Sequence, residues 1–173
     1  MRMNKYLVVD WKRHRRVTID TAPFIYMVEG GSPYNDVLKD FFNRVQRREI
    51  RAFTSALTLT EVLTIPLRKG QTDFVQSYRE LLLRAKNLRL VDLNHSTAER
   101  AAQLRADNPK GTVKKSILST PDAIQIATAI ESQSSIFLTN DKDLKKVKGL
   151  PQNLKIVTLE ELDLSFDSNT PNV

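Results

Sequence analysis

Residues 119–141, with the sequence STPDAIQIATAIESQSSIFLTND, indicate the fold more clearly than any other stretch of this chain. The opening Ser-Thr-Pro is typical of a helix start, because a hydroxyl caps the helix and proline suits its first turn. The residues that follow are apolar on almost every side, as in a helix that packs on more than one face. The chain then enters a short apolar run at 136–138. We therefore expect a buried helix followed by a buried strand.

Two carboxylates frame this segment. Asp122 lies in the first turn of the expected helix, and Asp141 follows the expected strand. Burying an unpaired carboxylate is costly, whereas the helix dipole alone offers an acid in the first turn only about 0.3–1 kcal/mol. A hard cation is therefore the obvious candidate partner for both acids.

The composition places limits on the class of protein. The 173 residues are enough for one domain with a real core, and 40% apolar and 27% charged residues are ordinary for a globular protein. The absence of cysteine excludes disulfides, a thiolate nucleophile and a cysteine zinc site. The chain has no apolar run long enough to span a membrane and no secretory signal at its start. We expect a cytoplasmic protein without membrane contact.

Positive charge is concentrated at the beginning of the chain. Residues 1–16 contain six Lys and Arg residues against Asp10 alone, so this basic arm holds +5 of the total net charge of +7. Basic segments bind polyanions such as nucleic acid. The arm, or a polar loop with Lys110, Lys114 and Lys115, could hold an RNA backbone; the alternative is that both are solvated surface.

Strand and helix patterns alternate along the rest of the chain. Strands are predicted near 17–20, 50–56, 88–93, 136–138 and 155–157, with helices between them at 21–28, 34–47, 57–67, 72–86 and 96–106. Ser96 and Glu99 suggest a capping box for the last of these helices, and Thr158 suggests a cap for a final turn. This order predicts a single α/β domain over 17–164, with a mostly parallel sheet covered on both faces. The arm at 1–16 is either an edge strand or flexible, and 165–173 is a polar tail that we expect to be disordered.

The acids fall where such a fold would bring them together. Asp20 ends the first strand, while Glu61 and Asp122 lie in the first turns of helices that follow strands. Ligands of open parallel sheets bind at the carboxyl ends of the strands, so we expect these acids and Asp141 on one rim. Mg²⁺ or Mn²⁺ would relieve their mutual repulsion. Such a metal activates water and neutralises phosphoryl charge, which suits phosphodiester hydrolysis.

Other catalytic patterns are weaker. The two histidines, His14 and His95, form no metal-binding or triad pattern, and the chain has no P-loop, GxGxxG or GxSxG motif. Asp10 also ends a strand-like patch, but Trp and basic residues follow it instead of an apolar helix. Asp20 is therefore the preferred first acid.

At this point the sequence resembles a known family. Four segments are similar, in order and approximate spacing, to the motifs of PIN-domain nucleases, and most of all to the VapC-like toxin branch: VTIDTAPFIY at 17–26, LTEVL at 59–63, PDAIQIATA at 121–129 and FLTNDKDL at 137–144. The resemblance covers residues 17–160. It implies a three-layer α/β/α PIN fold and a metal-dependent endoribonuclease that leaves a 5′-phosphate and a 3′-hydroxyl.

The resemblance also implies roles for single residues. Three acids match the core metal site and a fourth completes it: Asp20, Glu61, Asp122 and Asp141. Asp143 is the substitute if Asp141 does not fill the fourth position. Thr21 and Thr139 match hydroxyl positions near the metal, and Asn140 matches an outer partner of the site.

The VapC-like branch further implies partners. Its members are toxins of toxin–antitoxin pairs, so the resemblance implies a small antitoxin and a homodimer in addition to an RNA substrate. The alternative is a non-catalytic PIN-like module that binds RNA or acts as a scaffold. A phosphatase or a DNA flap nuclease would share the metal chemistry.

Overall fold

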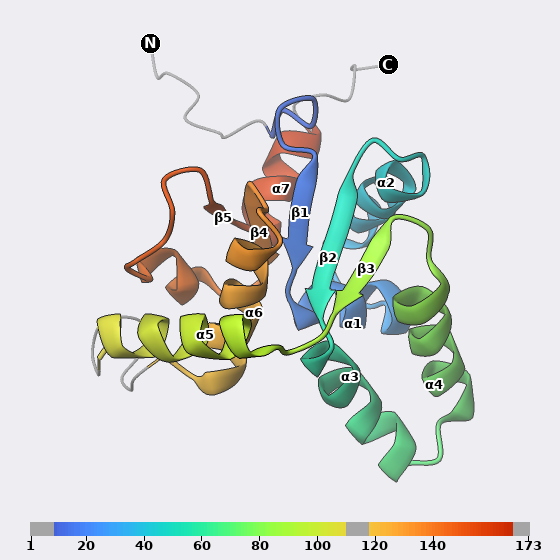
Figure 1. Ribbon diagram of the computed structural model, residues 1–173. Helices are drawn as coiled ribbons and strands as arrows, with labels where there is room; N and C mark the ends of the chain where they lie inside the picture. Colours follow the sequence, from blue (N-terminus) through green and yellow to red (C-terminus); the bar gives the residue numbers. More distant parts are fainter. Residues whose placement is uncertain (1–8, 110–117, 168–173) are drawn as a thin grey trace.

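The computed structural model describes residues 9–109 and 118–167. Within them, five strands form one sheet in the order β3-β2-β1-β4-β5, and every neighbouring pair is parallel (Figure 1). The strands are β1 Arg16–Ile19, β2 Arg51–Ser55, β3 Leu88–Val91, β4 Ile136–Thr139 and β5 Lys155–Thr158. All five lie where the sequence predicts a strand, and the expected parallel sheet is confirmed.

Helices cover the sheet on both faces and produce three layers (Figure 1). In chain order they are α1 Thr21–Glu29, α2 Asn35–Gln46, α3 Leu57–Arg68, α4 Thr72–Arg79, the π-helical turn η1 Glu80–Arg84, α5 His95–Asp107, α6 Thr120–Glu131, the 3-10 turn η2 Lys142–Lys146 and α7 Leu159–Asp167. None of the helices in the described part of the chain is long and apolar enough to cross a membrane.

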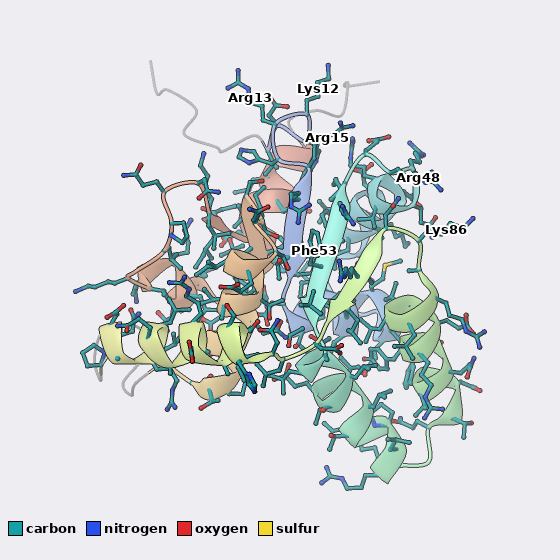
Figure 2. The ribbon with its side chains drawn as sticks, viewed as in Figure 1. Lys12, Arg13, Arg15, Arg48, Phe53 and Lys86 are labelled. Carbon is teal, nitrogen blue, oxygen red and sulfur yellow. The ribbon has the colours of Figure 1, made fainter. Side chains whose placement is uncertain are left out.

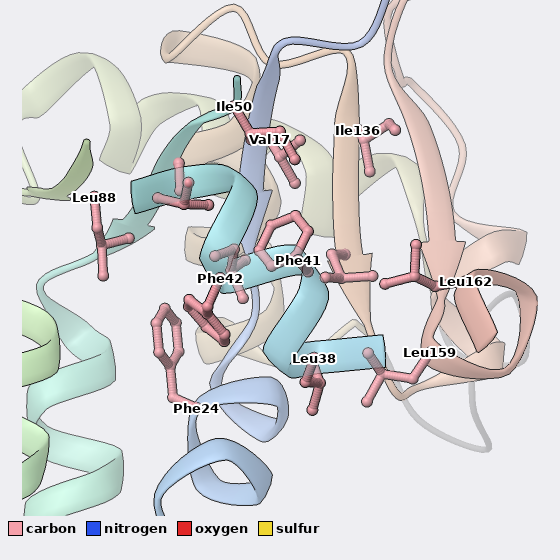
Figure 3. Close-up of a cluster of buried hydrophobic side chains, with 14 of the residues drawn as sticks. Val17, Phe24, Leu38, Phe41, Phe42, Ile50, Leu88, Ile136, Leu159 and Leu162 are labelled. Atoms are coloured by element: carbon pink, nitrogen blue, oxygen red, sulfur yellow. The ribbon is translucent and has the colours of Figure 1, made fainter. Parts of the chain in front are cut away.

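One face of the sheet packs on α1, α2 and the first turn of α7 (Figure 3). Phe41 and Phe42 of α2 meet edge to face with their ring centroids 5.4 Å apart, and Phe24 of α1 lies 5.7 Å from Phe42. Val17 of β1 and Leu38 of α2 are fully buried in the same cluster. The pattern of apolar residues in α2 therefore faces the sheet, as its helical spacing predicts.

The other face packs on α6, and α5 lies over α6. Ala123, Ile126, Ala127 and Ala129 are fully buried, between the sheet on one side and α5 on the other. Small side chains allow α6 to approach both neighbours closely. The prediction that residues 121–131 form a helix buried on more than one face is confirmed.

The strand order places a topological switch point between β1 and β4. From β1 the chain moves outward to β2 and β3, then returns through α5 and α6 to β4 on the other side of β1. In such sheets the carboxyl ends of the two strands flanking the switch form a crevice for ligands. Here those ends are Asp20, directly after β1, and Thr139, the last residue of β4.

Helix caps differ from the sequence prediction in one place. The Ser96–Glu99 capping box is wrong: α5 begins one residue earlier, and Asn94 caps it by accepting a hydrogen bond from the Thr97 N–H at 2.9 Å. Ser96 instead donates to Glu131 of α6 at 3.0 Å. Asparagine competes well as an N-cap, because its side chain reaches the same amide. The Thr158 cap is confirmed.

The last part of the basic arm belongs to the folded body. Val9 is buried in the core, and the ring centroid of Trp11 lies 5.6 Å from that of Phe41. The carbonyl of Asp10 accepts hydrogen bonds from the amides of Arg13 and His14, which makes residues 10–14 a turn. Residues 9–15 are thus a packed turn, neither an edge strand nor a free arm.

Several predictions concern residues outside the described part of the chain. These are the conformation of residues 1–8, the loop lysines Lys110, Lys114 and Lys115, and the end of the tail at 168–173. The final helix α7 continues to Asp167, three residues beyond the boundary predicted at 164.

Candidate active site

Asp20 stands at the switch point and is held from both sides of it. As the N-cap of α1, its Oδ1 accepts a hydrogen bond from the Thr21 N–H at 2.8 Å. Its Oδ2 accepts one from the Thr139 hydroxyl, at the end of β4, at 2.6 Å. Short hydrogen bonds to a carboxylate are strong and directional. The carboxyl group of Asp20 is therefore fixed between β1 and β4.

Thr21 connects Asp20 to the second acid. Its hydroxyl donates to Oε2 of Glu61, on α3. Glu61 is the fifth residue of α3, just past the first turn in which the sequence analysis places it, and that first turn holds no acid. The side chain nevertheless reaches the rim, because α3 starts at the carboxyl end of β2 and packs beside α1.

Asp122 enters from the first turn of α6. The Ser119 hydroxyl donates to its Oδ2 at 2.6 Å and accepts from its backbone N–H at 3.2 Å, so one serine caps the helix and orients the acid. The helix behind Asp122 is the most deeply buried in the domain. Rigid packing of this kind fixes the direction of a side chain at its end.

Asp141 is linked to Asp20 through one hydroxyl. Oγ1 of Thr139 donates to Asp20 and accepts from the Asp141 N–H at 3.0 Å. Asp141 in turn accepts from the backbone of Asp143 at 2.9 Å and caps η2. Asp143 forms an ion pair with Lys146 at 2.7 Å, which engages its carboxylate within η2. These contacts favour Asp141 over Asp143 as the fourth acid.

Asn140 takes a supporting place. Its side-chain amide donates to the Tyr26 hydroxyl of α1 at 2.9 Å. The bond ties the loop after β4 to the helix that Asp20 caps. Asn140 therefore connects the loop after β4 to α1 without contacting the four acids through this bond.

The electrostatics show that three acids are close enough to influence one another. The pKa of Asp20 is raised to about 6, mainly by burial and in smaller part by the charges of Asp122 and Glu61, against the hydrogen bonds from Thr139 and Thr21 that lower it. Like charges raise the pKa of a carboxyl, because they disfavour its ionised form. All four acids of the rim are half-buried.

The donor set suits a hard divalent cation, although the acids are not gathered into a tight ligand group. Among the described residues, no three His, Cys, Asp or Glu side chains lie close enough together to hold a metal ion. Hydroxyls from Thr21, Ser119 and Thr139 engage three of the carboxylates instead. Carboxylate oxygens are the ligands that Mg²⁺ and Mn²⁺ prefer, and a divalent cation would offset their negative charges.

Gln125 is a residue that the sequence prediction missed. It is only 1% exposed, in the middle of α6, and its amide donates to Thr58 at 2.8 Å and to Thr21 at 3.3 Å. Its oxygen accepts from the Ser55 N–H at 3.4 Å. Gln125 thus connects α6 to β2, to α3 and, through Thr21, to α1. Thr21 is the residue whose hydroxyl binds Glu61. The available signal was a lone amide inside a run of apolar residues.

Comparisons with known proteins agree with this geometry. A family model for the PIN domain matches residues 17–150. No match was found among the curated proteins.

Solved structures similar to this chain include toxin–antitoxin complexes. A chain of VapBC2 from Rickettsia felis, bound to a DNA fragment of its promoter, superposes with a TM-score of 0.64 at 15% identity, covering 83% of this chain and 98% of that one. DNA-bound VapBC from Salmonella typhimurium gives 0.60 at 18%, with the same coverage. VapC20 from Mycobacterium tuberculosis, a toxin that cleaves the sarcin–ricin loop, gives 0.52 at 17%, covering 70% and 86%.

Proposed function

The chain belongs to the PIN-domain family, and on this premise we propose that it is a metal-dependent endoribonuclease that hydrolyses phosphodiester bonds in RNA. The observation that carries the proposal is the rim at the switch point, where Asp20, Glu61 and Asp122 influence one another electrostatically. Asp141 shares the Thr139 hydroxyl with Asp20. Support for RNA comes from the structural likeness to a toxin that cleaves the sarcin–ricin loop.

Each residue of the rim has a part in this proposal. Asp20, Glu61, Asp122 and Asp141 would hold a divalent cation such as Mg²⁺ or Mn²⁺, which when bound acidifies a water and offsets phosphate charge. The Thr21 and Thr139 hydroxyls orient Glu61 and Asp20 through the hydrogen bonds described above. The Gln125 amide donates a hydrogen bond to the Thr21 hydroxyl, and the Ser119 hydroxyl donates one to the Asp122 carboxylate, so both side chains are held in place. These hydrogen bonds would hold the carboxylate oxygens in place before a cation binds. Such positioning matters, because a ligand or catalytic group that is misplaced loses catalytic power.

The test is cleavage of total RNA by purified protein with Mg²⁺, with Mn²⁺ and with a chelator. Asp20→Asn and Asp122→Asn should abolish metal-dependent cleavage while circular dichroism shows an intact fold. Asp143→Asn is the matched control, because that carboxylate pairs with Lys146 in η2. It should retain most activity, whereas Asp141→Asn should lose it. Undiminished cleavage by both Asp20→Asn and Asp122→Asn contradicts the proposal.

We further propose that the nuclease is the toxin of a toxin–antitoxin pair with a small antitoxin as its partner. The likeness to VapBC complexes supports this, together with a toxin–antitoxin complex from Klebsiella pneumoniae, which superposes with a TM-score of 0.56 at 22% identity. Induced expression of the chain should arrest growth, and co-expression with the product of a small neighbouring gene should restore it. Arrest that Asp20→Asn leaves unchanged contradicts a toxic nuclease.

A homodimer and a cytoplasmic location remain predictions. Apolar side chains at the end of α3 and on η1 are exposed: Ile65 at 49%, Leu67 at 56% and Leu83 at 56%. Exposed leucines of this kind mark protein contacts. Sedimentation of the wild type beside Leu67→Glu tests the dimer.

The second candidate is a non-catalytic PIN-like module that binds RNA or acts as a scaffold. The spacing of the acids favours it, since no three in the described part of the chain form a tight ligand group. Calorimetric titration with Mn²⁺ separates the two candidates. Binding that Asp20→Asn abolishes supports the nuclease, and no binding to the wild type supports the module.

A further inference from the structure

The amino ends of three adjacent strands are all preceded by basic residues. Lys12, Arg13 and Arg15 lead into β1, Arg48 leads into β2 and Lys86 leads into β3. We name these five side chains the basic edge. Because β3, β2 and β1 are neighbours in a parallel sheet, their amino ends meet at one side of the molecule. Figure 2 shows the five side chains gathered at that end, opposite the end where α1 and α3 begin.

The charges of the basic edge are exposed, and few acids offset them. Within the described residues, no acidic side chain forms an ion pair with Lys12, Arg15, Arg48 or Lys86. Of the nearby acids, Asp10 offsets only Arg13, at 3.5 Å, and Glu49 is bound by Arg44, outside the basic edge, at 3.1 Å. The positive field of this side therefore extends into solvent, where it attracts a polyanion.

The sheet beside the basic edge carries two further arginines. Their guanidinium groups lie over the ring of Phe53 on β2, that of Arg16 at 4.6 Å from the ring centroid and that of Arg51 at 5.8 Å. Burial and the charge of Arg51 lower the pKa of Arg16. Arg51 and Arg89 are exposed on the same sheet face, which register places next to Phe53. Because the Arg16 guanidinium also donates two hydrogen bonds to the Ser132 carbonyl oxygen, the exposed Arg51 and Arg89 are the cations that this face offers to an anionic ligand.

A pocket with one aromatic residue, Trp11, among charged side chains lies at the same end. It has a volume of about 400 Å³ and is lined by Trp11, Lys12, Arg15, Arg44 and Glu49. Trp11 is half-buried, with part of its ring packed near Phe41. Cations next to an accessible aromatic wall are the combination with which proteins bind the backbone and bases of nucleic acid.

We propose that the basic edge binds the phosphate backbone of RNA. It would be a second contact surface, remote from the acid rim, which consists of Asp20, Glu61, Asp122 and Asp141. This inference rests on the proposed function for the identity of the polyanion. Adjacent strands are about 4.8 Å apart, so the cations before three strands cover about 10 Å, wide enough for several phosphates of one chain. An acidic protein segment would satisfy the charge but would leave the pocket at Trp11 without a ligand.

The location of the basic edge predicts which RNA it affects. Strands of four or five residues at about 3.3 Å each separate the basic edge from the acid rim by roughly 13–17 Å. A tetranucleotide cleaved at its central bond extends only two nucleotides to either side of the rim, about 7 Å when stacked, whereas a long stem-loop RNA can cover both surfaces. The basic edge should therefore govern affinity for long RNA and leave the cleavage of tetranucleotides unchanged.

Binding is measured with the Asp20→Asn protein and a labelled stem-loop RNA, by fluorescence anisotropy over a range of salt concentrations. The test variant is Arg15→Gln, Arg48→Gln, Lys86→Gln, with one change before each strand. The matched control is Arg68→Gln, Arg79→Gln, Lys69→Gln, which removes two arginines and one lysine that are also exposed, on α3 and α4. Losing three phosphate contacts should lower the salt slope by about 2–3 and the affinity at 0.1 M salt by about 100-fold.

A second signal needs no mutation. Trp11 is the single tryptophan of the chain, so stem-loop RNA should quench the intrinsic fluorescence and a tetranucleotide should not. Equal affinity and salt slope for test and control variants, or an unquenched Trp11, overturns the proposal. If the wild type cleaves no RNA, the proposed function fails, while the binding and quenching results still decide whether the basic edge holds RNA.

Discussion

Replacing Asp20 with Asn should stabilise the metal-free protein at neutral pH, although it removes a residue of the proposed active site. The folded protein raises the pKa of this carboxyl from 3.8 to about 6, mainly by burial. A difference of about two pKa units corresponds to at most about 3 kcal/mol, since each unit is worth 1.36 kcal/mol and the side chain keeps some contact with water.

The direction with pH follows from the two protonation states. Well below pH 4, Asp20 is protonated in both the folded and the unfolded chain, so its burial costs little. Between about pH 4 and 6 the unfolded chain ionises first, and the free energy of unfolding falls as pH rises. Above pH 6 the buried carboxylate is charged and the full cost remains. Asparagine has no such charge, so Asp20→Asn should be as stable as the wild type at pH 4 and more stable at pH 7.

The assay is urea denaturation of both proteins in a chelator, at several pH values from 4 to 8. The difference between the two unfolding free energies should grow from near zero to at most about 3 kcal/mol, and most other titrating groups cancel in that difference. Adding Mn²⁺ at pH 7 should stabilise the wild type and leave Asp20→Asn unchanged. Parallel stability curves for the two proteins across this range would refute the reasoning.

Three further changes test the support of the rim and the core. Gln125→Leu should cost about 1–3 kcal/mol of stability in urea denaturation, because it removes the hydrogen bonds that Gln125 makes with Ser55, Thr58 and Thr21. Gln125→Glu serves as its comparison. Ser119→Ala should cost about 0.5–2 kcal/mol of stability through loss of the cap of α6, and it should also slow RNA cleavage. The control Ser96→Ala, next to the cap of α5, should leave the rate of RNA cleavage unchanged. Phe41→Ala should cost about 3–5 kcal/mol by thermal or chemical unfolding, since its ring is buried between Trp11 and Phe42; a loss below 1 kcal/mol would contradict this packing.

The spacing of apolar residues along the chain was enough to predict the architecture, because it indicates which helices and strands are buried. The apolar residues of α6 and the β-branched strand Val17–Ile19 could occupy only an interior. Strand order also placed Asp20, Glu61 and Asp122 at one edge, since parallel strands send their carboxyl ends the same way. The electrostatic coupling of these three acids is what that placement leads us to expect.

Contacts between distant segments were harder to predict. Glu61 lies just past the first turn of α3 in which we expected it, and the packing of α1 beside α3 brings Thr21 within hydrogen-bond reach of it. In the sequence, Gln125 is only a polar residue in an apolar run. Its role could not be predicted, because its three hydrogen-bond partners come from three other elements. The basic edge was anticipated only in part: Lys12, Arg13 and Arg15 belong to the basic arm, whereas Arg48 and Lys86 join them only through strand order, over 75 residues of chain.

The most direct test of the proposed function is RNA cleavage by chelator-treated protein to which metal is returned. The wild type should stop cleaving RNA when the divalent metal is removed and should regain activity when Mg²⁺ or Mn²⁺ is added back. Asp20→Asn should stay inactive throughout. Cleavage that continues in the chelator, or that Asp20→Asn performs as fast as the wild type, would contradict a metal-dependent nuclease built on this rim.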